Sequence, residues 1–204
     1  MVPEFFTRRQ PHLGMTPEEY RHLLELEAAR AEETADADKN EHTRHLPLNL
    51  ARTKRIEKSF RPDVKVRMAA QRISAPQLWM LLTEPWCGDS AQNLPCLAKI
   101  AACNPLIDLR ILLRDQNPDI MDAYLTNGAR SIPKLVVFDL QGRELFRWGP
   151  RPQPAAELFR QLRAGGTPLE DLHRKLHLWY GRNRGRALEE EILVLLQESD
   201  RKNQ

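Results

Sequence analysis

The sequence lacks the long apolar segment that a membrane-spanning helix requires. No uninterrupted run of about 18 apolar residues occurs in its 204 residues. Its opening stretch, MVPEFFTRRQPH, also lacks the apolar segment of a secretion signal. We therefore expect a protein of the cytoplasm that has no membrane partner.

Cysteine is scarce, with three residues and no spacing typical of a disulfide framework. This usage is typical of a reducing compartment, in which thiols stay free. Cys87 and Cys96 are nine residues apart on a predicted helix, or about 13 Å, and Cys103 is about 10 Å beyond Cys96. A disulfide needs Cα atoms within about 7 Å, so we expect no pair to close within the chain.

Excess charge is also small, because 31 Lys and Arg residues face 28 Asp and Glu residues. The formal net charge of +3 does not indicate a nucleic-acid partner. Between Arg44 and Arg72, however, nine basic residues accompany only Glu57 and Asp63. This segment is either a basic surface for nucleic acid or an acidic protein, or a solvated helical face. The lack of interleaved aromatic residues beyond Phe60 favours the solvated face.

The apolar pattern divides the chain into three regions. A helical N-terminal extension is expected over 1–76, a core over 77–164 and a C-terminal helical extension that packs on the core over 165–204. In the N-terminal extension we expect an irregular arm over 1–15, an acidic connector over 32–42, and helices over about 17–35, 43–60 and 63–73. The first of these helices begins with a capping box, Thr16-Pro17-Glu18-Glu19.

The core alternates apolar runs with helical segments. Strands are predicted over 77–83, 107–113, 134–139 and 143–148, and helices over about 89–103, 118–126 and 154–163. Because a strand–helix–strand crossover is right-handed, the strands 77–83 and 107–113 should be parallel neighbours.

The C-terminal extension contains two predicted helices. Thr167-Pro168-Leu169-Glu170 forms a second capping box, and the helix that follows should reach about Tyr180. The final helix carries an apolar stripe of Leu188, Ile192, Leu195 and Leu196. This stripe should pack on the rest of the chain, although a dimer contact is the alternative, so both a monomer and a homodimer remain open.

Cys87 lies at the step from a buried strand to a helix. Pro85 breaks the apolar run, and Trp86, Cys87 and Gly88 follow before the helix begins. At a helix N-terminus, free N–H groups and the helix dipole favour an anion. We therefore expect the Cys87 thiolate to be stabilised over the thiol.

The stretch Trp86-Cys87-Gly88-Asp89-Ser90 resembles the Trp-Cys-Gly-Pro-Cys active site of the thioredoxin superfamily. Pro95 resembles a helix-kinking proline of that family, and Ser131-Ile132-Pro133 resembles its cis-proline loop. Gly142 and the run 144–149 resemble its terminal hairpin. The resemblance covers about residues 77–164 and is closest to a bacterial subgroup with a single active-site cysteine. It implies an α/β fold of three layers with a four-stranded mixed sheet.

The resemblance also implies roles for individual residues. Cys87 and Ser90 would be catalytic, and the substrate would be bound by Trp86, Gly88, Asp89, Ile132 and Pro133. The main chain of Ile132 would pair with an extended substrate segment.

Departures from the family pattern affect proton handling at Cys87. At the two positions where the family has a buried carboxylate and its lysine partner, this chain has Leu81 and Ile111. The charge of Asp89 opposes a thiolate, whereas Ser90 can donate a hydrogen bond to one, and the sequence leaves this balance open.

Several functions are compatible with a single cysteine in this position. A monothiol oxidoreductase would act on protein thiols or disulfides and use an outside thiol, glutathione or another small thiol, as co-substrate. The alternatives are a redox sensor or protein-binding module, an inert buried thiol, and a dimer that holds a [2Fe–2S] cluster, as in monothiol glutaredoxins. Asp89 stands where their C-G-F-S motif has an aromatic residue. We expect no resident cofactor.

Two other polar pairs have structural interpretations. His173 and His177 are four residues apart, a spacing that can bind a metal, but no further ligands accompany them. We therefore expect no metal site here. Arg114 and Asp115 are interpreted as an ion pair, and Trp179 and Tyr180 as anchors of the C-terminal extension.

Overall fold

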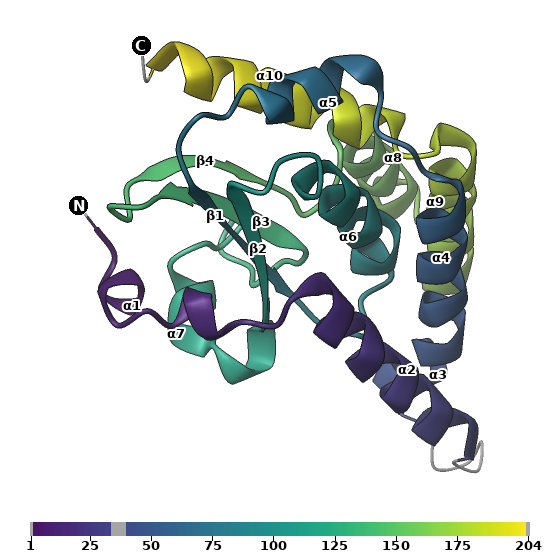
Figure 1. Ribbon diagram of the computed structural model, residues 1–204. Coiled ribbons are helices and arrows are strands. Elements are labelled where there is room, and N and C mark those ends of the chain that lie inside the picture. Colours follow the sequence, from purple (N-terminus) through teal and green to yellow (C-terminus); the bar gives the residue numbers. More distant parts are fainter. Residues whose placement is uncertain (1, 34–39, 203–204) are drawn as a thin grey trace.

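The computed structural model describes residues 2–33 and 40–202 and has a four-stranded mixed sheet at its centre (Figure 1). The strands are β1 (Gln77–Thr83), β2 (Ile107–Leu113), β3 (Lys134–Asp139) and β4 (Glu144–Trp148), in the order β2-β1-β3-β4. β1 pairs in parallel with β2 and antiparallel with β3, and β3 pairs antiparallel with β4. The predicted strand positions and the parallel β1–β2 pair are confirmed.

Helices cover both faces of this sheet, which gives the expected three-layer α/β architecture. α6 (Gly88–Ala101) covers one face, where Trp79 and Leu81 of β1 lie in the main hydrophobic core. α7 (Pro118–Asp122) covers the other face, against Met80 and Leu82. α7 is shorter than predicted because the chain turns tightly beyond it, and Thr126 pairs there with Ala129.

The N-terminal extension contributes four helices that the structure describes between residues 17 and 71. They are α2 (Pro17–Glu33), α3 (Glu41–Arg44), α4 (Leu46–Ser59) and α5 (Val64–Gln71). The capping box of α2 is formed, since Thr16 N–H donates to Glu19 Oε2 at 2.7 Å and Glu19 N–H donates to Thr16 Oγ1 at 3.2 Å. Most of the predicted acidic connector lies outside the described residues.

Two predictions for this extension are wrong. The single helix expected over 43–60 is divided at His45 into α3 and α4. Pro47 explains the division, because proline has no N–H and is tolerated only in the first turn of a helix. The arm over 1–15 is not irregular either, since it contains α1 (Glu4–Thr7) and a short 3-10 helix (Pro11–Leu13). Phe5 and Phe6 in α1 pack on Phe138 of the sheet, which accounts for its order.

The C-terminal extension begins after α8 (Gln153–Ala164) and forms α9 (Leu169–Asn183) and α10 (Arg186–Lys202). The capping box predicted at Thr167 is absent, because Pro168 occupies the N-cap position and makes no side-chain bond. On α10, Leu188, Ile192 and Leu196 are buried in the main core. The apolar stripe therefore packs within the chain rather than across a dimer.

The two extensions enclose α6, so that every residue from 89 to 97 is buried. Apolar and polar positions of this helix are covered alike, and α4 is one of the elements that contact it. Asp89, Gln92 and Asn93 are each less than a tenth exposed. Buried polar groups need partners, and the extensions supply them beside Cys87. Among residues 2–33 and 40–202, no helix combines the length and apolar character that crossing a bilayer demands.

Candidate functional site

Cys87 is the N-cap residue of α6, where the extended backbone of the preceding loop turns into the helix. Its Sγ accepts a hydrogen bond from Ser90 N–H at 3.5 Å, and its thiol donates to the carbonyl of Ile132 at 3.5 Å. The Ile132–Pro133 peptide bond is cis. Cys87 as a whole residue is 8% exposed. The loop that resembles a cis-proline loop therefore lies directly against the cysteine.

Burial outweighs the stabilisation that the helix N-terminus was expected to give the thiolate. Burial, followed by the charge of Asp89, raises the pKa of the Cys87 thiol to about 11, although hydrogen bonds from Ser90 lower it. The direction is opposite to the expectation from the helix dipole. At neutral pH the residue is a protonated thiol.

Ser90 lies behind Cys87 and outside the cavity described below. It is 1% exposed, and its hydroxyl accepts a hydrogen bond from Thr83 Oγ1 at 2.5 Å. Leu81 and Ile111 are fully buried and face each other in the β1–β2 register. No carboxylate therefore occupies either of these two positions.

Asp89 is a buried carboxylate whose two oxygens are both bound. Tyr180 of α9 donates to Oδ1 at 2.8 Å, and Arg151 forms an ion pair with Oδ2 at 2.6 Å. Asn93 donates to the Asp89 carbonyl at 2.8 Å and to the Tyr180 hydroxyl at 3.1 Å. These contacts make Asp89 the anchor of α9 on α6 as well as a neighbour of the thiol.

Trp86 lies between two side chains from distant parts of the chain. The His42 ring stacks on it with centroids 4.2 Å apart and planes 9° apart, and the Arg114 guanidinium lies 4.8 Å from its centre. Arg114 also forms the predicted ion pair with Asp115, at 2.8 Å. The indole is thereby held in one orientation beside Cys87.

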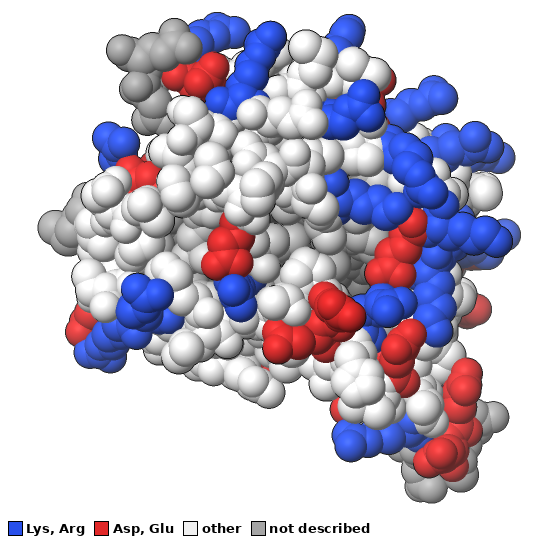
Figure 2. All heavy atoms as spheres, viewed as in Figure 1, with Lys and Arg blue, Asp and Glu red and all other residues white. Residues whose placement is uncertain are grey.

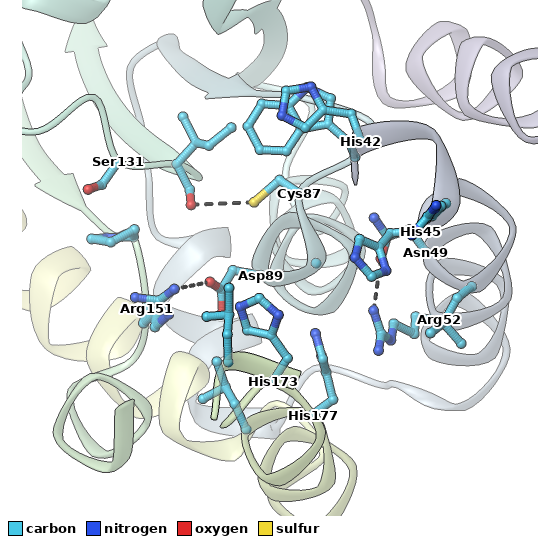
Figure 3. A pocket seen from close by; sticks show the side chains of 18 of the residues that line it. His42, His45, Asn49, Arg52, Cys87, Asp89, Ser131, Arg151, His173 and His177 are labelled. Carbon is cyan, nitrogen blue, oxygen red and sulfur yellow. Dashed lines mark hydrogen bonds and ion pairs between the residues drawn. The ribbon is translucent and has the colours of Figure 1, made fainter. Parts of the chain in front are cut away.

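A cavity of about 1040 Å³ opens over Cys87. Its walls come from α3, α4 and α9, and Figure 3 shows Arg52 and His45 on one side, with His173 and His177 on another. Of the predicted site residues, Trp86, Cys87, Gly88, Asp89 and Ile132 line this cavity, whereas Ser90 and Pro133 do not.

His177 packs on the first turn of α6 and is neutral. A Cβ atom at Gly88 would lie 2.8 Å from its ring, so the glycine provides the space that the imidazole occupies. Arg55 donates a hydrogen bond to Gln92 Oε1 at 3.1 Å. This bond orients the Gln92 side chain so that its amide nitrogen lies 3.2 Å from His177 Nδ1, within hydrogen-bond distance. Burial and then the Arg52 charge lower the pKa of His177 to about 3. Among the described residues, no three His, Cys, Asp or Glu side chains are grouped so that they could hold a metal ion.

Arg52, on another side of the cavity, is a polar residue that the sequence alone did not single out. It was interpreted as one of nine basic residues on a solvated face, and Figure 2 shows Lys and Arg side chains gathered over α4. Arg52 instead lines the cavity. The run of basic residues was the one feature of the sequence that pointed to Arg52. Whether its side chain faces solvent or the cavity depends on how α4 packs, and the sequence does not show this.

Comparisons with known proteins support the fold. A family profile described as Thioredoxin matches residues 36–163, more than half of the chain. Among solved structures, the chain is similar to a protein of unknown function from Pseudomonas aeruginosa, with 19% identity, a TM-score of 0.56 and coverage of 92% of this chain and 94% of that one. It is also similar to an HIV epitope-scaffold, with 21% identity, a TM-score of 0.54 and coverage of 83% and 90%. No match was found among the curated proteins.

The solved structures are less than 25% identical and show the fold alone. The profile match begins ahead of β1, so part of the N-terminal extension belongs to the family domain. Together with the strand order β2-β1-β3-β4 and the cysteine at the start of α6, this match identifies the chain as a member of the thioredoxin family.

Proposed function

We propose that the protein is a single-cysteine thiol–disulfide oxidoreductase in which Cys87 forms a mixed disulfide that an outside thiol resolves. The observation that supports this proposal most directly is the position of Cys87. Its thiol donates a hydrogen bond to the Ile132 carbonyl, and the residue lines the cavity. Cys96 lies in the main hydrophobic core and Cys103 packs against that core, away from the cavity over Cys87, and all three thiols are free.

The reaction needs two exchanges. In the first, the Cys87 thiolate attacks one sulfur of a disulfide X–S–S–R, the Cys87–S–S–R bond forms, and X–S⁻ leaves and takes a proton from solvent. In the second, the thiolate of a free R–SH attacks the R sulfur, R–S–S–R forms, and the Cys87 thiolate is released. The net reaction, X–S–S–R + R–SH → X–SH + R–S–S–R, oxidises one R–SH and reduces the X sulfur to a thiol, so atoms and electrons balance.

The groups around Cys87 would stabilise such a mixed disulfide. An extended substrate segment would pair with the main chain at Ile132, and Trp86 would cover the cysteine from the side opposite Pro133. The Ser90 N–H that bonds to Sγ would stabilise the thiolate as it leaves the mixed disulfide. Leu81 and Ile111 leave no carboxylate for proton transfer to a second thiol, which is consistent with resolution from outside.

A second candidate function is favoured by the raised pKa of Cys87. A buried thiol with a pKa of about 11 is a weak nucleophile at neutral pH, which suits a sensing or protein-binding module that forms an adduct slowly and keeps it. The two functions differ in turnover, because only the oxidoreductase is regenerated by a small thiol.

The test is a turnover assay with a glutathionylated peptide as substrate and reduced glutathione as co-substrate. An oxidoreductase should release the peptide thiol many times per protein molecule, and Cys87→Ser should abolish the release. The double variant Cys96→Ser/Cys103→Ser should retain it. A single stoichiometric release in the presence of glutathione would instead favour the module, and no adduct at Cys87 by mass spectrometry would overturn both.

A further inference from the structure

The walls of the cavity over Cys87 determine what can reach the thiol. Helices α4 and α9 come from the two extensions and stand on either side of the first turn of α6. The volume of about 1040 Å³ is at the upper end of the range for small-molecule sites. Cys87 is 8% exposed, so a disulfide held on the surface of a folded protein would have to enter between these walls.

The cavity is also rich in positive charge, and most of that charge is already paired. Arg114, Arg130, Arg151 and Arg174 line it, and each forms an ion pair with an aspartate, at 2.6–2.8 Å. Arg44 and Arg52 line it as well, and neither forms an ion pair with any carboxylate that the structure describes; Arg44 is exposed, whereas Arg52 is half-buried. Arg52 is therefore a partly buried cation without an ion-pair partner among the described residues. The charge of Asp89 favours this cation, but Arg151 and Tyr180 already bind the two Asp89 oxygens.

Arg52 is held in place beside the cysteine. Its Nη1 donates to Asn49 Oδ1 at 2.9 Å, and the Asn49 amide donates to the carbonyl of Pro85 at 3.1 Å, in the loop that leads to Cys87. Asn49 is completely buried, so this chain of bonds is fixed. The same Nη1 atom would lie 3.5 Å from a Cβ at Gly88, the residue after the cysteine. The other guanidinium N–H donors remain for a ligand.

We propose that the cavity binds a low-molecular-weight thiol or its disulfide, with a carboxylate of the ligand on Arg52 and its sulfur at Cys87. A guanidinium matches a carboxylate with two parallel hydrogen bonds. Arg52, which has no ion pair among the described residues, offers a half-buried guanidinium beside Gly88, the residue after the reacting cysteine. Nearby His177 is neutral and does not compete for the anion. The proposal rests on the proposed function, since it names the small thiol that enters the mixed disulfide.

Three disulfides of different charge test the proposal: glutathione disulfide, which carries carboxylates, neutral 2-hydroxyethyl disulfide and cationic cystamine. The rate of mixed-disulfide formation at Cys87 is measured by mass spectrometry and divided by the rate of the same reagent with a free cysteine peptide. Glutathione disulfide should react about tenfold faster than cystamine on this scale, the gain of one charge-assisted hydrogen bond. Added salt should reduce this preference.

Arg52→Met should remove about a tenfold rate advantage from glutathione disulfide and leave 2-hydroxyethyl disulfide unchanged. Arg52→Lys should keep part of the advantage. Lys58→Met, on the exposed face of α4, is the matched control and should behave as the original protein does.

The results of these experiments distinguish the carboxylate site on Arg52 from the proposed oxidoreductase function. If no disulfide modifies Cys87, the oxidoreductase itself is excluded. If the three reagents react equally, or Arg52→Met slows all of them alike, the oxidoreductase stands and the carboxylate site on Arg52 is refuted. Should Arg52→Met not fold, the salt dependence in the original protein and the Arg52→Lys variant still decide the question.

Discussion

Tyr180 donates a 2.8 Å hydrogen bond to Asp89, which lies 91 positions earlier in the sequence and two positions after Cys87. The bond joins α9 to the first turn of α6, the helix that begins at the candidate site. With the Arg151 ion pair on the other oxygen, it offsets the desolvation of a carboxylate that is only 8% exposed. The extension is therefore part of the site.

Tyr180→Phe should destabilise the protein by about 1.5–3 kcal/mol, because a buried hydrogen bond to a charged group is lost. Urea denaturation measures the change. Tyr124→Phe is the control: Tyr124 is also buried, but its hydroxyl makes no side-chain hydrogen bond among the described residues. Equal losses in the two variants would show that the Tyr180–Asp89 bond contributes nothing.

Asp89→Asn should lower the pKa of the Cys87 thiol, since the negative charge of Asp89 is the second cause of its elevation. The pH at which the alkylation rate is half-maximal, read by mass spectrometry in Cys96→Ser/Cys103→Ser protein, should shift to lower pH. Asp108→Asn, an exposed position on β2, should leave this midpoint in place. An upward shift in Asp89→Asn would contradict the electrostatic account.

Gly88→Ala should destabilise the protein in one background and stabilise it in another. A Cβ at this position would meet the His177 ring at 2.8 Å, so the substitution pushes α9 away from α6. In His177→Ala protein that clash is gone, and the better helix propensity of alanine should add up to about 1 kcal/mol. A double-mutant cycle by thermal or urea unfolding measures both signs. Destabilisation of the same size in both backgrounds would rule out the clash.

His177 should make the protein sensitive to acid. Its pKa is lowered from 6.5 to about 3 in the folded state, so the unfolded chain binds a proton that the native protein does not. The stabilisation is therefore complete above about pH 6.5 and is lost as the pH falls toward 3. His177→Gln should flatten the decline of unfolding free energy across this range, whereas His22→Gln, on an exposed position of α2, should not. Parallel curves for all three proteins would disprove the assignment.

Local signals in the sequence were sufficient for the elements of the core. The apolar run over 77–83 coincides with β1, because a strand that is buried on both faces leaves an unbroken apolar pattern. The strand predicted over 107–113 coincides with β2, although Asp108 is exposed there. The Thr16–Glu19 capping box is likewise a local motif, and it is formed. Phe5 and Phe6 show the limit of such signals: a helix of four residues has no periodicity to detect, and its order depends on contact with Phe138.

The cysteine motif could be recognised from the adjacent residues in the sequence, whereas the residues that form the cavity walls could not. Arg52 and Tyr180 approach Gly88 and Asp89 only through the packing of α4 and α9 on α6, and Arg151 reaches Asp89 from the loop between β4 and α8. No local pattern encodes these contacts. The pKa of Cys87 was left open for the same reason. Its largest cause is burial, and burial beneath distant helices is a property of the folded chain.

The enclosure of α6 by both extensions has a consequence for biosynthesis. During translation the strands and α6 leave the ribosome before α9, so Asp89 is without Tyr180 and Gly88 is without its imidazole neighbour until α9 follows. The nascent chain would therefore carry an open groove with a more accessible thiol. The cavity around Cys87 would close only when α9 packs on α6.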